Sequence, residues 1–267
     1  IDEAQKLYDR LSWVRPEGAM EKVLNYSRAA VGIYDGVAQQ RSWDCGPASA
    51  QIVLQSAGIL KDEQWLIDQI GTTTNGTNHS GLITPVLNKL LPGSGYTVVW
   101  LRKEPVPKVD VEALWKNVKR SIDANRGAIF NFVAPPNNFP RATRGDSSPE
   151  YRGNNTIFHY VACMGVADDG PGGRHFWIAD PGFRPHGYWI SLEQAASLIV
   201  PHSYAYAADA TASTVTPPPV VVPPKADPVA DLTLKVEKLS EALSLLLRII
   251  EQSNPEILRA YMEATKG

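Results

Sequence analysis

The chain has 267 residues, enough for one substantial domain and an appendage. Its 26 lysines and arginines nearly balance 28 aspartates and glutamates, so the formal net charge is −2. No overall basic field therefore points to nucleic acid or to an anionic membrane as a partner. No apolar run is long enough to span a bilayer and no signal peptide is recognisable, so we expect no membrane span.

The segment 1–35 is predicted to be a helical extension that packs on the domain after it. Residues 2–14 place apolar side chains at helical spacing, and residues 20–30 are interpreted as a second helix that leads into the following segment.

The stretch from Gln39 to Pro47 is the most informative part of the chain, because it places Cys45 at the start of a predicted helix that ends near Gly58. A thiol at a helix N-terminus meets the positive end of the macrodipole and free backbone N–H groups, which favour the thiolate. The same N–H groups, with the carboxamide of Gln39 or Gln40, are suited to hold the oxyanion of an acyl-transfer intermediate. The alternative is a buried structural cysteine.

Three helices, a strand and a long loop are predicted in the next part of the chain. Helices are expected over residues 61–70, 82–91 and 111–124, and a strand over residues 96–101. Residues 135–155 are rich in Pro, Asn, Arg and Ser, which predicts a long loop at the border of an active-site cleft.

Residues 157–166 are apolar on both faces and predict a buried central strand that carries His159. A Gly- and Pro-rich turn follows, and residues 175–181 predict a second, antiparallel strand. A histidine in an apolar strand is, by itself, more often a satisfied core residue than a catalyst. His159 therefore needs partners before it can be assigned a role.

The expected hairpin register supplies one such partner. Folding the two strands about their turn brings Val161 opposite Asp180, which places His159 and Asp180 diagonally on the same face. Diagonal neighbours lie about 7–8 Å apart at the backbone, close enough for an imidazole and a carboxylate to meet. A slip of one residue would separate them.

These placements together fit one thiol-dependent acyl-transfer site. Cys45 is predicted to attack a carbonyl, His159 to carry the proton, and Asp180 to fix the tautomer of the imidazole. Gln39 is predicted to polarise the carbonyl, with Gln40 as the alternative. The residues expected to contact the substrate are those beside the nucleophile: Trp43, Asp44 and Gly46.

The two cysteines are expected to remain free thiols. A disulfide between Cys45 and Cys163 would consume the proposed nucleophile, and Cys163 lies on an apolar strand that is typical of an inert buried thiol. No two histidines or cysteines have the spacing of metal ligands on one element, so we expect neither a metal nor another cofactor.

The motifs resemble those of the bacteriocin-processing cysteine peptidases and their wider relatives. They are Gln39 followed, after five intervening residues, by Cys45-Gly-Pro-Ala, then His159-Tyr-Val and Asp180-Pro-Gly. The resemblance implies an α+β, papain-like fold for residues 36–206, with the nucleophile helix packed on an antiparallel sheet. It also implies thiol-dependent cleavage of peptide or isopeptide bonds.

More closely, residues 36–200 resemble the N-terminal peptidase domain of mycobacteriophage lysin A endolysins, including the segments 71–87 and 126–132. This resemblance implies peptidoglycan stem peptides or cross-links as the substrate. It further implies an enzyme held in the host cytoplasm before lysis that acts at the bacterial cell wall, or alternatively a virion-associated one.

The composition changes sharply after residue 207. Residues 207–230 form a Pro-rich linker, and residues 231–267 place apolar side chains at alternating steps of four and three. We interpret this coiled-coil-like helix as a short bundle between chains, which predicts a homo-oligomer. The alternatives are a helix packed on its own domain or one that docks another protein.

Two other functions stay open. One is a catalytically idle papain-like domain that serves as a wall-binding or structural phage component, and the other is a thiol acyltransferase. The presence of all four residues favours an active enzyme over an idle domain: Gln39, Cys45, His159 and Asp180.

Overall fold

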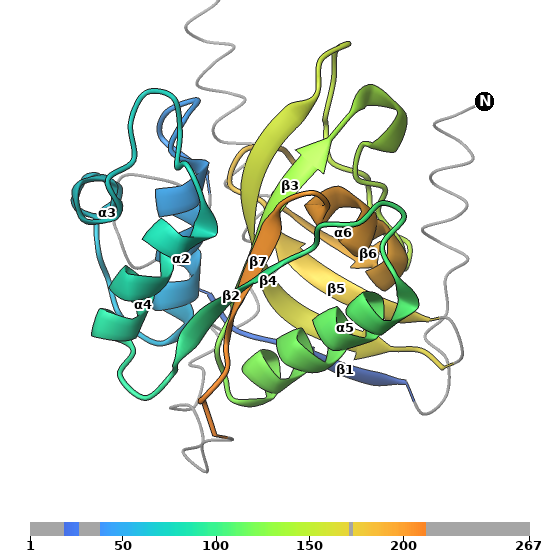
Figure 1. The fold of residues 1–267 in the computed structure, drawn as a ribbon, viewed down its shortest axis with the longest axis horizontal. Helices are drawn as coiled ribbons and strands as arrows, with labels where there is room; N and C mark the ends of the chain where they lie inside the picture. The colour runs from blue at the N-terminus through green and yellow to red at the C-terminus, as the bar shows by residue number, and fades with distance from the viewer. Residues whose placement is uncertain (1–18, 27–37, 171–172, 212–267) are drawn as a thin grey trace, which may run out of the picture. The chain divides into compact units, whose positions relative to one another are not determined.

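An antiparallel sheet forms the centre of the computed structural model, which describes residues 19–26, 38–170 and 173–211 (Figure 1). By its internal contacts the chain divides into two compact units, residues 1–214 and 215–267, and the described helices and strands all belong to the first.

Several predicted elements lie outside the described residues. They are the helix at residues 2–14, the helical segment 231–267 and nearly all of the linker 207–230. These elements, and the oligomer inferred from them, stay predictions.

Within the described residues the sheet has seven strands in the order β2-β7-β3-β4-β5-β6, with β1 paired to β4 beside this path. Every pairing is antiparallel. The strands are β1 (Met20–Val23), β2 (Tyr96–Trp100), β3 (Ala128–Ala134), β4 (Ile157–Asp168), β5 (Arg174–Ala179), β6 (Gly187–Ser191) and β7 (Ser203–Ala207).

The helices lie in two groups. Figure 1 shows α2, α3 and α4 gathered to one side of the sheet, while α5 and α6 pack across it. Helix α2 contacts β4, and α5 contacts β4, β7 and α6. The helices are α2 (Cys45–Ser56), α3 (Glu63–Ile70), α4 (Thr84–Leu90), α5 (Lys108–Asp123) and α6 (Leu192–Ile199), with short 3-10 turns η2 (Ser80–Leu82) and η3 (Pro136–Asn138).

Buried aromatic rings join α5 to the sheet. Phe130 and Phe176 lie side by side on β3 and β5 with centroids 5.4 Å apart in an edge-to-face arrangement. Trp115 of α5 packs on Phe176 at 5.6 Å, and Tyr204 of β7 meets Phe130 at 6.4 Å. Such pairs contribute roughly 0.5–1.5 kcal/mol each beyond the area that they bury.

Most of the predicted elements are present. Helix α3 begins after Asp62, whose side chain accepts the Trp65 N–H, and it ends at Gly71 in the left-handed conformation. The predicted helices at 82–91 and 111–124 correspond to α4 and α5. Among the described helices, none is long and apolar enough to cross a membrane.

The helix predicted over residues 20–30 is wrong where the structure describes it, since residues 20–23 form the strand β1. Strand β3 ends its pairing opposite Cys163, so the rest of β4 has a free edge that β1 occupies. Gly165 permits this approach, because a Cβ there would lie 2.9 Å from the Lys22 carbonyl oxygen. Backbone pairing with the free edge of β4 therefore determines the conformation of residues 20–23, in place of their local helix propensity.

Candidate active site

Cys45 is the first residue of α2, a helix with eleven of its twelve residues buried. The Asp44 carboxylate at the N-cap position makes no bond to the helix and instead accepts the Arg41 N–H at 3.0 Å. The N–H groups of the first turn are therefore left for other acceptors, and that of Gly46 hydrogen-bonds the Cys45 thiol. The buried helix gives the nucleophile a fixed position.

His159 and Asp180 meet as the hairpin register predicts. Ala162 pairs with Ala179, and continuing this register places Val161 opposite Asp180. His159 Nε2 lies 2.8 Å from Asp180 Oδ1. A bulge between Cys163 and Gly165 shifts the register only beyond this point, so the prediction of the contact is confirmed.

The Asp180 carboxylate is completely buried and fully hydrogen-bonded. Oδ1 accepts from His159 and from the N–H groups of Gly182 and Phe183 at 2.8, 2.9 and 3.1 Å. Oδ2 accepts from the hydroxyls of Tyr151 and Tyr188, each at 3.0 Å. Burial opposes the charge, but His159 and these donors outweigh it and hold the pKa of Asp180 below its usual value.

The thiol and the imidazole form a coupled pair. Burial opposes protonation of His159, but the charge and hydrogen bond of Asp180, and then those of Cys45, raise its pKa to about 10. Burial likewise opposes ionisation of Cys45, yet the His159 interaction and backbone hydrogen bonds from Tyr160 and Gly46 lower the pKa of the thiol. Both shifts favour the thiolate–imidazolium form of the pair.

Gln39 is positioned at this pair by the loop after β5. Its N–H donates to the Pro181 carbonyl at 2.8 Å, and its side-chain oxygen finds no hydrogen-bond partner among the residues that the structure describes. A Cβ on Gly182 would lie 2.6 Å from the His159 ring and 3.0 Å from this Gln39 oxygen. Gln40 is exposed instead. The placement favours Gln39 over Gln40 as the amide that faces the site.

Asp44 does not lie where a substrate contact would need it. Its side chain is completely buried and holds the loop before Cys45 through the Arg41 N–H. Glu63 of α3, only 1% exposed, hydrogen-bonds Asp44 and accepts the Gln40 N–H at 3.2 Å. Burial and Asp44 together raise the pKa of Glu63 to about 8, so one proton is held between the two carboxyls.

Gly46 and Trp43 contact the loop before η2. Thr77 packs so closely on the nucleophile helix that a Cβ on Gly46 would lie 2.3 Å from its Oγ1. The Thr77 hydroxyl is in turn hydrogen-bonded to Thr72 at 2.7 Å. Trp43 is partly exposed, with the Arg41 guanidinium 5.4 Å from its ring centroid. Trp43 is thus accessible to a substrate, whereas Gly46 is buried and offers only its backbone.

The aromatic surroundings of the imidazole were not predicted. Phe183 meets the His159 ring edge-to-face at 5.2 Å, and Tyr151 stacks on Phe183 at 3.9 Å. Tyr151 belongs to the loop 135–155, which the sequence predicts at the border of the active site. That prediction is the one indication in the sequence that Tyr151 lies near His159. Nothing in the spacing of Tyr188 along the chain indicates that its hydroxyl reaches Asp180.

Both cysteines are free thiols. Cys163 is completely buried, and burial raises the pKa of its thiol well above the usual value. Among the residues that the structure describes, no three His, Cys, Asp or Glu side chains cluster as metal ligands do.

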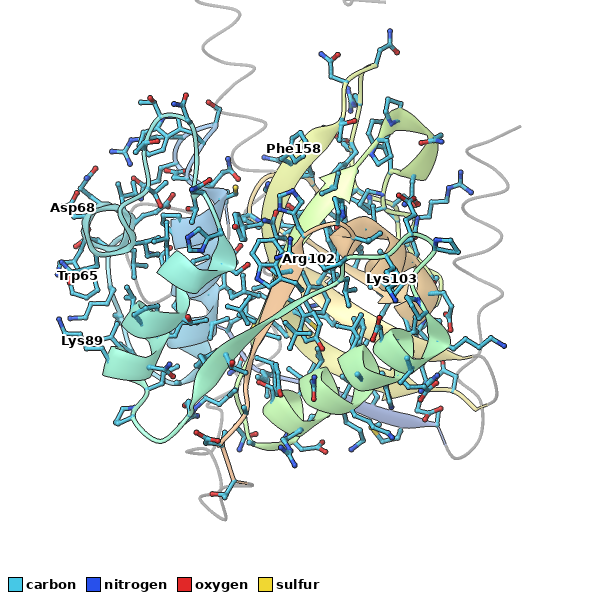
Figure 2. All side chains as sticks on the ribbon, in the orientation of Figure 1. Trp65, Asp68, Lys89, Arg102, Lys103 and Phe158 are labelled. Carbon is cyan, nitrogen blue, oxygen red and sulfur yellow. The ribbon has the colours of Figure 1, made fainter. Side chains whose placement is uncertain are left out.

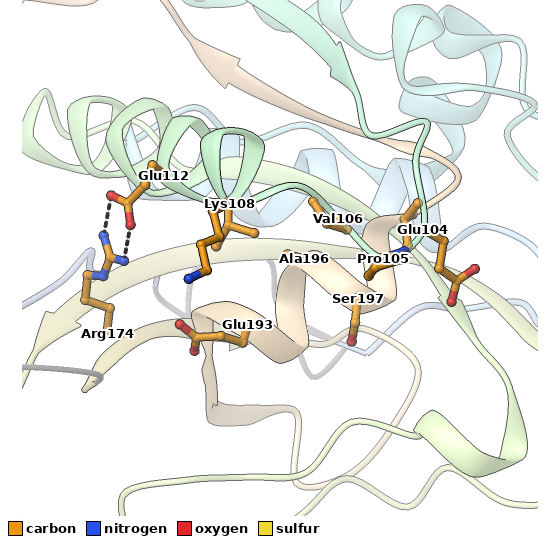
Figure 3. A pocket seen from close by; sticks show the side chains of 11 residues that line it. Glu104, Pro105, Val106, Lys108, Glu112, Arg174, Glu193, Ala196 and Ser197 are labelled. Carbon is orange, nitrogen blue, oxygen red and sulfur yellow. Dashed lines mark hydrogen bonds and ion pairs between the residues drawn. The ribbon is translucent and has the colours of Figure 1, made fainter.

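A pocket of about 500 Å³ lies elsewhere, between the start of α5 and α6 (Figure 3). Glu112 and Arg174 form a bidentate ion pair at its rim, with N–O distances of 2.5 and 2.9 Å. None of the predicted site residues lines it, so this pocket is separate from the candidate active site. Its other labelled lining residues are Glu104, Pro105, Val106, Lys108, Glu193, Ala196 and Ser197.

A thiol at the start of a buried helix, facing an imidazole and a buried carboxylate on an antiparallel sheet, defines the papain-like class of cysteine peptidase folds. The model of the Peptidase_C39 like family matches residues 34–207, so the chain belongs to this family of cysteine peptidases. The predicted α+β, papain-like fold is confirmed. No curated protein matches the chain.

Several solved structures are similar to the chain. The peptidase domain of Streptococcus ComA, a bi-functional ABC transporter involved in quorum sensing, is 17% identical over 63% of this chain and 95% of that one, with a TM-score of 0.39. A putative C39-like peptidase from Bacillus anthracis is 15% identical over 70% and 97%, with a TM-score of 0.42. A double glycine motif protease from an AMS/PCAT transporter, in complex with its leader peptide, is 17% identical over 70% and 99%, with a TM-score of 0.37.

Proposed function

We propose that this chain is a cysteine peptidase of the phage endolysin type that cleaves peptide bonds of bacterial peptidoglycan. The single observation that carries peptidase activity is the buried set of Cys45, His159 and Asp180, joined by hydrogen bonds in that order. The choice of peptidoglycan rests on the resemblance of the sequence to the lysin A peptidase domains.

Acylation begins when the Cys45 thiolate attacks the carbonyl carbon of the scissile bond. His159 Nε2 is engaged with Asp180, so Nδ1 is the nitrogen that faces the thiol and protonates the leaving amine. The Cys45 N–H at the helix start and the second N–H of the Gln39 side-chain amide donate to the oxyanion. The Gln39 amide nitrogen also donates to the Arg41 carbonyl at 2.6 Å, which orients it.

Deacylation reverses these roles. The leaving amine departs, and His159, now neutral at Nδ1, accepts a proton from a water molecule that attacks the thioester. The tetrahedral intermediate collapses to the free carboxylic acid and the Cys45 thiolate, while His159 keeps the proton. Asp180 stays ionised throughout, because its donors stabilise the carboxylate form.

The setting of this activity is also a proposal. We infer that the enzyme is held in the host cytoplasm and reaches stem peptides or cross-links at lysis, and that residues 231–267 join several chains. Virion association is the alternative. Several linked copies would raise the avidity for an insoluble substrate without new contacts in the cleft.

The test compares the wild-type protein, Cys45→Ala and the control Cys163→Ala on purified mycobacterial-type peptidoglycan, with released fragments identified by mass spectrometry. Cys163 is the matched control because it is the second free thiol and its Sγ donates to the Gly165 carbonyl, away from the His159 imidazole. We expect stem-peptide fragments from the wild type and the control only. Folded protein that releases no fragments would reject the proposal.

A further inference from the structure

Three exposed or partly exposed rings lie in contact at the surface, and together with Arg102 they are called the aromatic strip: Phe158, His202 and Trp100. Phe158 and Trp100 are 66% and 38% exposed. The His202 ring lies between them, edge-to-face with Phe158 at 6.0 Å and stacked on Trp100 at 6.3 Å. Contiguous exposed rings are costly in water and mark binding surfaces.

The sheet assembles this strip from distant parts of the chain. Trp100 ends β2 and pairs with Ser203, which brings the preceding His202 beside it. Strand β7 is separated from β4 by β3 alone, so Phe158 at the start of β4 comes within reach. In Figure 2, Phe158 lies at the upper end of β4 and Arg102 below it, where β2 has ended.

The strip is continuous with the candidate active site. Asn131 bridges the two, since its amide nitrogen lies 3.1 Å from His202 Nδ1 and 3.0 Å from the Tyr160 hydroxyl. The backbone of Tyr160 hydrogen-bonds the Cys45 thiol. Phe158 also directly precedes His159 in β4, so the strip begins beside the candidate active site.

Arg102 gives the strip a charge that no carboxylate of the described residues neutralises. The centre of its guanidinium lies 4.0 Å from the Trp100 ring centroid, and within the described residues it forms no ion pair. Burial and then the charge of Arg102 lower the pKa of His202, so this ring is neutral near pH 7. A stacked guanidinium keeps its N–H donors free for a carboxylate, which it binds with two parallel hydrogen bonds.

We propose that the aromatic strip holds the substrate's peptide chain on one side of the scissile bond, with Arg102 paired to a carboxylate of that chain. This inference rests on the proposed peptidase function and names the substrate chemistry that the site would select. A single cation among neutral rings matches one carboxylate on a peptide. A nucleic acid or an anionic membrane requires several cations in a row.

Binding is measured with the full chain carrying Cys45→Ala, so that nothing is cleaved. The probes are a peptidoglycan stem tetrapeptide with free carboxylates and the same peptide with every carboxylate amidated, titrated by calorimetry. Arg102→Gln is the test variant. Lys103→Gln is the matched control, since it removes the same charge from the next exposed residue.

We expect Arg102→Gln to weaken binding of the acid peptide by about tenfold and to leave the amidated peptide unchanged. Lys103→Gln should alter neither by more than about twofold. Phe158→Ala should weaken both peptides, because it removes ring contact and no charge. Equal effects of Arg102→Gln and Lys103→Gln, or no binding of either peptide to folded protein, would overturn the proposal.

The peptidase function is judged separately by cleavage. If fragments are released in a cysteine-dependent way and the strip variants bind peptide normally, the proposed role of the aromatic strip is rejected and the peptidase function is retained. Loss of acid-peptide binding in Arg102→Gln, with no cleavage by the wild type, would support the strip as a binding surface and reject the peptidase.

Discussion

The Asp180 carboxylate sets the protonation state of the imidazole that faces Cys45. It is buried, and its charge and hydrogen bond are the interactions that raise the pKa of His159 to about 10. The active thiolate–imidazolium pair exists above the pKa of Cys45 and below that of His159. The alkaline limit of activity therefore depends on Asp180.

Asp180→Asn should lower kcat/KM by roughly 10²–10⁴ and move the alkaline limb of its pH profile to lower pH. The reason is that the pKa of His159 falls when the carboxylate charge is lost. Tyr151→Phe is the control, because it removes one hydrogen bond to Asp180 and keeps the charge. An alkaline limb that stays in place in Asp180→Asn would contradict this role.

The Glu63 carboxyl predicts a separate pH dependence, that of stability. Its pKa is raised from 4.5 to about 8 in the folded protein, so its contribution is fully present below pH 4.5 and is lost as the pH rises through about 8. Glu63→Gln removes this titration and keeps a side chain that can still hydrogen-bond Asp44.

We therefore expect the melting temperature of the wild type to fall more steeply between about pH 4.5 and 8 than that of Glu63→Gln. Thermal unfolding at several pH values in this range measures the difference in melting temperature between the two proteins. The other titrating groups are present in both, so their contributions cancel in this difference. Parallel curves for the two proteins would mean that the Glu63 pKa is not raised by folding.

At the scale of elements, the contact between α2 and the loop before η2 depends on a residue without a side chain. Gly46→Ala would place a Cβ 2.3 Å from Thr77 Oγ1. Alanine favours a helix by about 1 kcal/mol over glycine, but overpacking typically costs about 1–3 kcal/mol. We expect a net loss of stability and a larger loss of kcat, because the displaced residue adjoins the nucleophile.

Thr77→Ala in the same chain should recover part of both losses, since it removes the hydroxyl that the new Cβ meets. Stability from thermal unfolding and kcat with a peptide substrate, measured for both single variants and the double variant, give the coupling between the two positions. Additive effects would show that the two residues do not interact.

Local sequence patterns are sufficient to predict the helix and the hairpin that carry the candidate active site. The helix after Cys45 and the hairpin that joins His159 to Asp180 each follow from residues close in sequence. Strand β1 could not be predicted, because it forms only where the far half of β4 lacks a neighbour. The contact of Glu63 with Asp44 likewise depends on how α3 packs, which no spacing reveals.

For the whole molecule, the boundary between the two compact units decides how the C-terminal segment should be tested. Ala208 and Asp209 donate backbone hydrogen bonds to the carbonyls of Gly95 and Ser94, so a truncation after residue 207 would damage the catalytic unit. Truncation after Thr214 respects the division between the units.

This truncated protein should have a smaller assembly mass than the full chain, because the predicted helical bundle is removed. Light scattering measures the mass, and cleavage of a short soluble peptide is the control, since it should proceed at the same rate in both proteins. An unchanged number of chains per particle would reject the bundle.

The hydrogen bond from the Gln39 N–H to the Pro181 carbonyl joins the helical side of the cleft to its sheet side. Gly182, next along, lies against both the Gln39 amide and the His159 ring. A bulky ligand that pushed the two sides apart would separate the oxyanion donor from the proton carrier at the same moment. We therefore expect extended peptide chains to leave the site assembled, and thick or branched ones to disrupt it.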